Sequence, residues 1–248
     1  MSFSGQVRAA FRRGDSDAVV RMSEIEIDRA RAAGDPAGEV EAVYSLARVA
    51  IRGGDLAEGH RLAEAALAVA LRAGDRALEE RPRHVLAAVA RMSGNLEQAR
   101  VLYRDSIALN ETLDQPENVN SEIHNLAFCE LKLGNLEQAQ TLFTTSRERV
   151  FQEGWDSFVP YVCVAGAALA SAEGDHRRAA VMVGVADAAF TGIGQVPDPD
   201  DAADLAAIRA AATDLLGPAA FDAQYARGQA LDPRTAFADR PSVTDLST

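Results

Sequence analysis

Arginine, histidine and aromatic side chains recur at spacings of about forty residues, and their chemistry suits binding rather than catalysis. Tyr44, His84 and His124 form one such series, and Arg48 and Phe128 belong to a second series one helical turn along. Arginine can hold a carboxylate through two parallel hydrogen bonds, and aromatic rings supply contact area at a low entropic cost. This pattern predicts a surface that recognises an acidic peptide or a C-terminal carboxylate.

The full candidate site adds basic and amide residues that neighbour these two series. Its members are Tyr44, Arg48, Arg52, His84, Arg91, His124, Asn125, Phe128 and Lys132. The alternative is that these are ordinary solvated residues, because Arg and Lys stems routinely cover apolar surface. The two histidines would then be stacking neighbours and nothing more.

Motifs of the common catalytic and metal-binding sites are missing from the sequence. It has no Gly-x-x-x-x-Gly-Lys loop, no His-Glu-x-x-His, no Cys-x-x-Cys and no Gly-x-Ser-x-Gly. An acidic cluster lies near the C-terminus, at Asp198, Asp200, Asp201 and Asp204. It lacks the glycine and the terminal glutamate of an EF-hand, so we interpret it as a solvated loop at a helix N-terminus. We therefore expect no enzyme activity, no metal and no cofactor.

The elements that position these residues are marked by a glycine, or once an aspartate, every twenty residues. The positions are Gly14, Gly34, Gly54, Gly74, Gly94, Asp114, Gly134, Gly154, Gly174 and Gly194. Glycine adopts the left-handed conformation that ends one helix, and the Asp or Asn that often follows can accept the amide protons that open the next. The stretches between are rich in good helix formers. The sequence predicts an all-α chain of about twelve helices.

The repeat unit is a helical hairpin of about forty residues, because the hexapeptide Gly94–Ala99 recurs at Gly134–Ala139. Columns of small residues follow the same spacing. They are Ala47, Ala87, Ala127, Ala167 and Ala207, and, on the partner helices, Gly59, Ala99, Ala139 and Ala179. A column that stays small predicts close helix contact. Tyr103 and Phe143 also recur at this spacing, and we expect both in the core.

Leu-Ala in the first helix, then Gly-Asx-Leu-x-x-Ala, an aromatic residue and a small residue resemble the tetratricopeptide repeat over residues 14–190. The long helices resemble bacterial MalT-like regulators. A C-terminal pattern around Gly184, Phe221 and Gly228 is similar to the end of actinobacterial LuxR-type and AfsR-type transcriptional regulators. The resemblance implies a right-handed α-solenoid, whose first helices line a concave groove that holds the candidate site.

The expected organisation has three parts. Residues 1–190 form the tetratricopeptide-like solenoid, residues 191–231 form a loop and a capping helical pair, and residues 232–248 form a flexible tail. The full-length regulators carry an ATPase domain and a DNA-binding domain, and this sequence has neither. It is either a stand-alone relative or an excised region of a larger regulator.

Composition narrows the class of partner. The 248 residues are 48% hydrophobic and carry a net charge of −12, which repels phosphate backbones and argues against direct nucleic-acid binding. No apolar run is long enough to span a membrane and no secretory signal is evident, so we expect a cytoplasmic protein without a membrane partner. Cys129 and Cys163 are expected to be reduced thiols in the core.

The sequence thus predicts a non-catalytic protein- or peptide-binding scaffold in bacterial signalling or transcriptional regulation, with the partner in the concave groove. The alternative is a small-molecule effector sensor of the MalT-like kind. The sequence leaves open the partner, the pathway and the oligomeric state, a homo-oligomer included.

Overall fold

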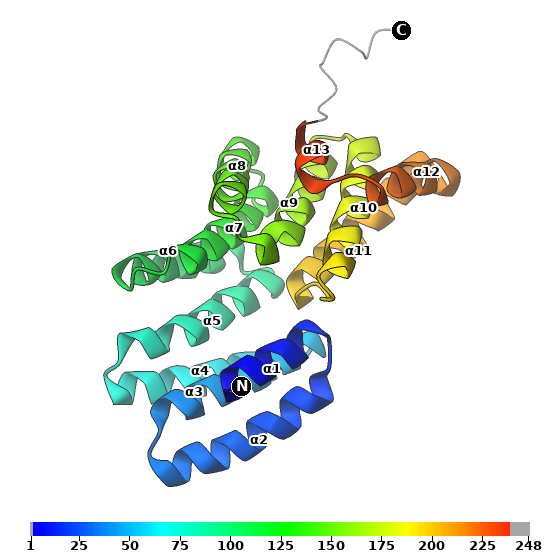
Figure 1. The fold of residues 1–248 in the computed structure, drawn as a ribbon. Helices are drawn as coiled ribbons and strands as arrows, with labels where there is room; N and C mark the ends of the chain where they lie inside the picture. Colours follow the sequence, from blue (N-terminus) through cyan, green and yellow to red (C-terminus); the bar gives the residue numbers. More distant parts are fainter. Residues whose placement is uncertain (1, 239–248) are drawn as a thin grey trace, which may run out of the picture. The chain divides into compact units, whose positions relative to one another are not determined.

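A computed structural model of the chain describes residues 2–238. All regular secondary structure in that range is helical (Figure 1). The α-helices are α1 Phe3–Arg12, α2 Ser16–Ala33, α3 Pro36–Arg52, α4 Leu56–Ala73, α5 Glu80–Met92, α6 Leu96–Thr112, α7 Pro116–Lys132, α8 Leu136–Glu153, α9 Val159–Ala172, α10 His176–Gly192, α11 Pro199–Leu216, α12 Pro218–Gln229 and α13 Pro233–Ala238. Short 3₁₀ helices at Arg76–Glu79 and Asp156–Phe158 precede α5 and α9. The all-α prediction is confirmed.

The helix ends lie at the predicted marks. At the end of α2, Gly34 has a φ of 63°, and Asp35 accepts a hydrogen bond from the Gly38 N–H at 3.0 Å to open α3. Asp114, the one aspartate in the glycine series, also has a positive φ, of 54°. The alternation of left-handed residue and side-chain cap therefore sets the helix lengths.

Between residues 2 and 238 the structure has one more α-helix than the twelve expected, because α13 lies within the predicted tail. Pro233 suits the first position of a helix, and the Asp232 carboxylate caps the turn by accepting from the Thr235 N–H at 3.1 Å. The rest of the predicted tail, residues 239–248, lies outside the described residues.

Contacts group the chain into two units, which are described separately. Unit 1 is residues 2–142 together with Asp198–Asp200, and unit 2 is Phe143–Pro197 with the described residues from Asp201 on. The sequence prediction placed its division after residue 190, where the loop begins.

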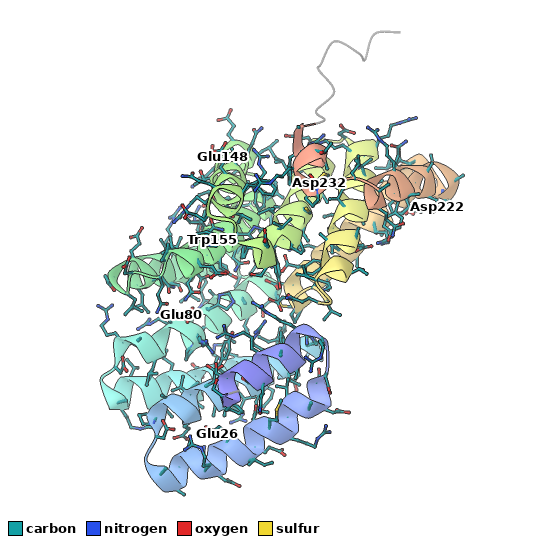
Figure 2. All side chains as sticks on the ribbon, viewed as in Figure 1. Glu26, Glu80, Glu148, Trp155, Asp222 and Asp232 are labelled. Carbon is teal, nitrogen blue, oxygen red and sulfur yellow. The ribbon has the colours of Figure 1, made fainter. Side chains whose placement is uncertain are left out.

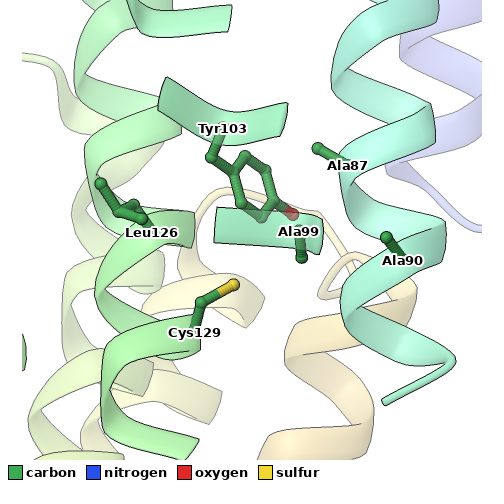
Figure 3. Close-up of a cluster of buried hydrophobic side chains, with 6 residues drawn as sticks. All are labelled: Ala87, Ala90, Ala99, Tyr103, Leu126 and Cys129. Atoms are coloured by element: carbon green, nitrogen blue, oxygen red, sulfur yellow. The ribbon is translucent and has the colours of Figure 1, made fainter. Parts of the chain in front are cut away.

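In unit 1 each helix from α1 to α6 packs on the next one in sequence. The first helices of neighbouring hairpins also contact one another, α3 with α5 and α5 with α7. Figure 3 shows one of the cores that result, in which Tyr103 lies among Ala87, Ala99 and Leu126. Tyr103 and both alanines are fully buried, as the repeat columns predict. Large residues set against small ones let these helices approach closely.

Gly59 shows why the column of Gly59, Ala99, Ala139 and Ala179 contains only small residues. A Cβ atom added there would lie 2.6 Å from Cγ1 of Ile51, on the neighbouring helix α3. The other members of this column, Ala99, Ala139 and Ala179, are completely buried. Bulkier side chains in the column would push the paired helices apart.

In unit 2 two glycines mark a close backbone contact between α10 and α12. In α10 a Cβ atom on Gly184 would lie 2.2 Å from the Tyr225 carbonyl oxygen, and in α12 one on Gly228 would lie 1.9 Å from the Val181 carbonyl oxygen. The two glycines of the C-terminal sequence pattern therefore let the backbones of α10 and α12 touch. Phe221 packs beside this contact and is 4% exposed.

The small column ends before α11, contrary to the sequence prediction. Ala207 is exposed, and α11 instead buries Leu205, Ile208 and Ala212. The forty-residue register is therefore lost beyond α10, after the loop that precedes α11.

Two further observations concern the class of protein. Within residues 2–238 no helix combines the length and the hydropathy needed to cross a membrane. Cys129 and Cys163 are both buried, as predicted.

Candidate peptide-binding site

Three arginines on the first helices of unit 1 form the centre of the candidate site. Arg48 and Arg52 lie one turn apart on α3, and Arg91 lies in the last turn of α5. We call these three residues the arginine row. The side chains of Arg48 and Arg52 are 20% and 17% exposed, whereas that of Arg91 is 1% exposed. The row therefore runs from a partly hydrated end to a buried one.

Two carboxylates of the same chain contact the arginine row. Arg48 donates a hydrogen bond to Oδ1 of Asp198 at 2.8 Å, and Nη2 of Arg52 lies 3.9 Å from the same oxygen. Arg91 donates to Oδ2 of Asp200. Asp198 and Asp200 lie at the start of α11 and are grouped with unit 1 by their contacts. The row thus has two carboxylates of its own chain as partners, and its predicted part in binding another molecule stays a prediction.

This contact corrects the interpretation of the acidic cluster as a solvated loop. The Asp200 side chain is 14% exposed, and Asp201 and Asp204 are 4% and 8% exposed. A carboxylate can leave water at low cost only when a cation or hydrogen-bond donors replace it. For Asp200 that cation is Arg91.

Aromatic rings support the guanidinium groups. Arg48 and Arg52 lie over the ring of Phe11 in α1, with 3.7 Å and 3.5 Å from each Cζ to the ring centroid. Arg91 lies over the ring of Phe128 at 4.9 Å. Arg52 also donates to the Phe11 carbonyl oxygen at 2.6 Å. Stacking and this hydrogen bond hold the arginine heads in place before any ligand arrives.

The electrostatics of the buried end favour a bound anion. Burial alone would raise the pKa of Asp200, but the charges of Arg91 and His84 hold that pKa below its ordinary value. Burial, with the nearby charge of Arg91, lowers the pKa of His124 to about 3. At neutral pH the site therefore has a charged Asp200 beside a neutral His124.

An ion pair between a partly exposed histidine and a buried glutamate lies near the arginine row. Nδ1 of His84 is 3.1 Å from Oε1 of Glu122, and the Ser106 hydroxyl donates to the same oxygen at 2.8 Å. Burial opposes protonation of His84, but the charge and hydrogen bond of Glu122 raise its pKa to about 9. Burial also raises the pKa of Glu80, at the start of α5 (Figure 2), to about 7. His84 is therefore a cation at neutral pH and is already engaged by a carboxylate.

The structure gathers most of the predicted site but changes the role of its aromatic half. Phe128 is 1% exposed and His124 is 2% exposed, and their rings meet edge to face at 5.2 Å. These two rings therefore pack beneath the Arg91 side chain in the interior of unit 1 and are not exposed to a partner. Asn125 is also buried, at 7% exposure. Tyr44, on α3, is partly exposed and lies 5.7 Å from the Arg48 guanidinium.

Lys132 is exposed in the last turn of α7, and its part in the site stays a prediction.

Sequence reasoning missed Phe11, and it missed that Asp198 and Asp200 contact the arginines. These carboxylates come 150 and 109 residues after their partners, outside the repeat register, so no periodicity links them. The burial of Glu122 could have been predicted from the sequence. It stands at the same position of the forty-residue repeat as Ala42, Pro82 and Val162, which are all buried.

The solved structures that resemble the chain include the following two. BtubC (BKLC) from P. vanneervenii matches with a TM-score of 0.55 and 20% identity, over 93% of this chain and 92% of its own. A Rap protein in complex with competence and sporulation factor matches with a TM-score of 0.63 and 13% identity, over 95% of this chain and 72% of its own. No protein-family model and no curated protein matches the sequence. At these identities the likeness concerns the fold, and the chain is an all-α helical-repeat protein.

Proposed function

We propose that the chain is a non-catalytic binding protein that holds an acidic peptide segment on the arginine row of unit 1. Its biological setting in this proposal is bacterial signalling or transcriptional regulation, of the kind that the MalT-like and LuxR-type resemblance implies. The partner is a protein or peptide, without direct contact to nucleic acid or to a membrane.

One observation carries the proposal, namely that the row already binds carboxylates of protein origin. Arg48 holds Asp198 at 2.8 Å, and the buried Arg91 holds Asp200. Guanidinium groups fixed on aromatic rings lose little conformational entropy when a carboxylate binds, so the site is preorganised for that ligand. The Asp198 end remains 30% exposed, so solvent and a partner can reach it.

The fold supports a binding role in a more general way. Helical repeats present extended surfaces along the stack of first helices, and a protein of similar fold has been crystallised in complex with competence and sporulation factor. Among residues 2–238 no group of three or more metal-ligating side chains is gathered.

A selection from a displayed library of random short peptides tests the proposal. We expect the selected peptides to be rich in Asp and Glu and to bind more weakly as salt rises, because the contact is between charges. Their affinity for the double variant Arg48→Glu with Lys132→Glu should fall by about tenfold or more, because repulsion replaces attraction.

Arg72→Glu with Arg76→Glu is the matched control, since it makes the same change in charge at two exposed arginines, one in the last turn of α4 and one in the 3₁₀ helix that follows it. It should leave the affinity unchanged. The proposal is wrong if no acidic peptides are enriched, or if the double variant binds the selected peptides as well as the native protein does.

The alternative function is a sensor of a small effector. Such a ligand needs an enclosed, mostly apolar pocket. Unit 2 has a depression of about 510 Å³ lined by α10 and α11 residues that include Leu205, Ala206 and Arg209. It is open to solvent, which favours the peptide reading over the effector reading. A thermal-shift screen against metabolites separates the two functions. If the protein senses an effector, one of the metabolites should raise its melting temperature. Under the proposal above, only an acidic peptide should raise it.

A further inference from the structure

The segment Asp198-Pro199-Asp200 has the properties of a bound ligand rather than of a simple loop. Its two carboxylates reach two different first helices, α3 through Arg48 and α5 through Arg91. They are separated by one residue, and that residue is proline. Proline fixes its own backbone and keeps Asp198 extended, so the segment presents both carboxylates with little entropic cost.

The buried end of the row sets a condition on anything that replaces this segment. The Arg91 side chain is 1% exposed, and a buried guanidinium is strongly destabilising without an anionic partner. A molecule that displaces Asp200 therefore binds best when it brings a carboxylate to the same position. At the outer end of the row, Arg48 and Arg52 contact Asp198. A replacing ligand therefore needs a second carboxylate, separated by one residue from the carboxylate that binds Arg91.

We infer that the partner of the arginine row is a peptide with two acidic residues separated by a single residue, and that the chain's own Asp198-Pro199-Asp200 occupies the row until such a peptide displaces it. The inference rests on the proposed function and adds to it the spacing of the ligand's carboxylates and an internal competitor. The exchange is carboxylate for carboxylate, so neither state leaves the row without its counter-charge.

The strength of the internal competitor follows from its tether. A segment on a short connection has an effective concentration on the order of 1 mM. If its own affinity for the row lies near 0.1 mM, it weakens an external peptide by about tenfold. Removing both internal carboxylates should therefore raise the affinity for an external peptide by about that factor.

The test uses a fluorescently labelled peptide with the sequence of residues 195–203, acetylated and amidated at its ends, added to the full chain. Fluorescence polarisation gives its affinity for the native protein, for Asp198→Asn with Asp200→Asn, and for the control Asp214→Asn with Asp222→Asn. The control makes the same change in charge at two exposed positions of unit 2. We expect about tenfold tighter binding by the first double variant alone, and loss of that binding when Arg48→Glu is added.

Asp198→Asn alone guards against a folding defect in the double variant, because the Asp198 side chain is 30% exposed and lies at the outer end of the row. It should give a smaller gain in affinity in the same direction, with an unchanged circular dichroism spectrum. Equal binding by the native protein and both Asp198 variants overturns the internal competitor but leaves the proposed function standing. If no form binds the peptide, the carboxylate spacing is wrong, and the library selection above then decides whether the proposed function survives.

Discussion

The contact between α10 and α12 makes the most quantitative prediction of the structure. In Gly228→Ala the new Cβ atom would lie 1.9 Å from the Val181 carbonyl oxygen, and real Cβ atoms essentially never come within 3.0 Å of such an atom. The obstacle is backbone and cannot rotate away, so α12 must move off α10 by about 1 Å. Gly184→Ala meets the Tyr225 carbonyl oxygen at 2.2 Å and should behave in the same way.

The expected size of the effect combines two opposing contributions. Overpacking against a rigid neighbour costs about 3 kcal/mol, at the upper end of its usual range. Alanine in place of glycine within a helix returns about 1 kcal/mol. The free energy of unfolding of unit 2 should therefore fall by about 2 kcal/mol. Gly192→Ala is the control, because its Cβ atom in α10 would meet nothing within 4 Å.

Urea denaturation followed by tryptophan fluorescence measures this effect in the right part of the chain. Trp155 is the single tryptophan of the sequence and lies in unit 2 (Figure 2), so its emission reports on the unfolding of that unit. We expect a lower urea midpoint for Gly228→Ala and an equal or higher midpoint for Gly192→Ala. Equal midpoints for Gly228→Ala and the native protein would refute the backbone contact.

Three further predictions concern unit 1. Asp35→Ala removes the cap that accepts from the Gly38 N–H, so the urea midpoint should fall, and an unchanged midpoint would contradict the cap. His84 has its pKa raised from 6.5 to about 9, so the stability that its pair with Glu122 contributes is fully present below pH 6.5 and is lost as the pH rises to 9. The loss should be about 1 to 2 kcal/mol because the His84 side chain is 28% exposed, and His84→Gln should remove this slope from denaturation curves measured across that range. Tyr103→Phe should leave the melting temperature unchanged or raise it, because the buried Tyr103 hydroxyl has no hydrogen-bond partner within residues 2–238, and a clear fall would mean that the hydroxyl is bonded.

The helices and their packing could be predicted because they depend on local and periodic signals. A glycine such as Gly34 ends its helix through its own backbone conformation, and Ala99 is buried because every repeat puts a small residue there. The loss of the column at Ala207 could not be predicted in this way. The forty-residue spacing of the buried small residues is lost after α10, and no residue before the loop indicates that change.

The candidate site could be predicted only in part, for a related reason. Repeat spacing aligned Arg48 with Phe128, but whether each side chain is exposed depends on non-repeating neighbours. Phe128 is buried by His124 and Arg91, and Arg91 in turn is occupied by Asp200. Charge complementarity between the acidic cluster and the arginines was the one signal available, and it does not say which carboxylate meets which arginine.

The account depends most on the ion pair between Arg91 and Asp200. A double-mutant cycle with Arg91→Gln, Asp200→Asn and the combined variant measures their coupling free energy by urea denaturation. Since the Arg91 side chain is 1% exposed, we expect a coupling of about 2 kcal/mol, with the double variant more stable than the two single losses together would imply. A coupling of zero would mean that Asp200 does not bind the arginine row, and it would contradict the account.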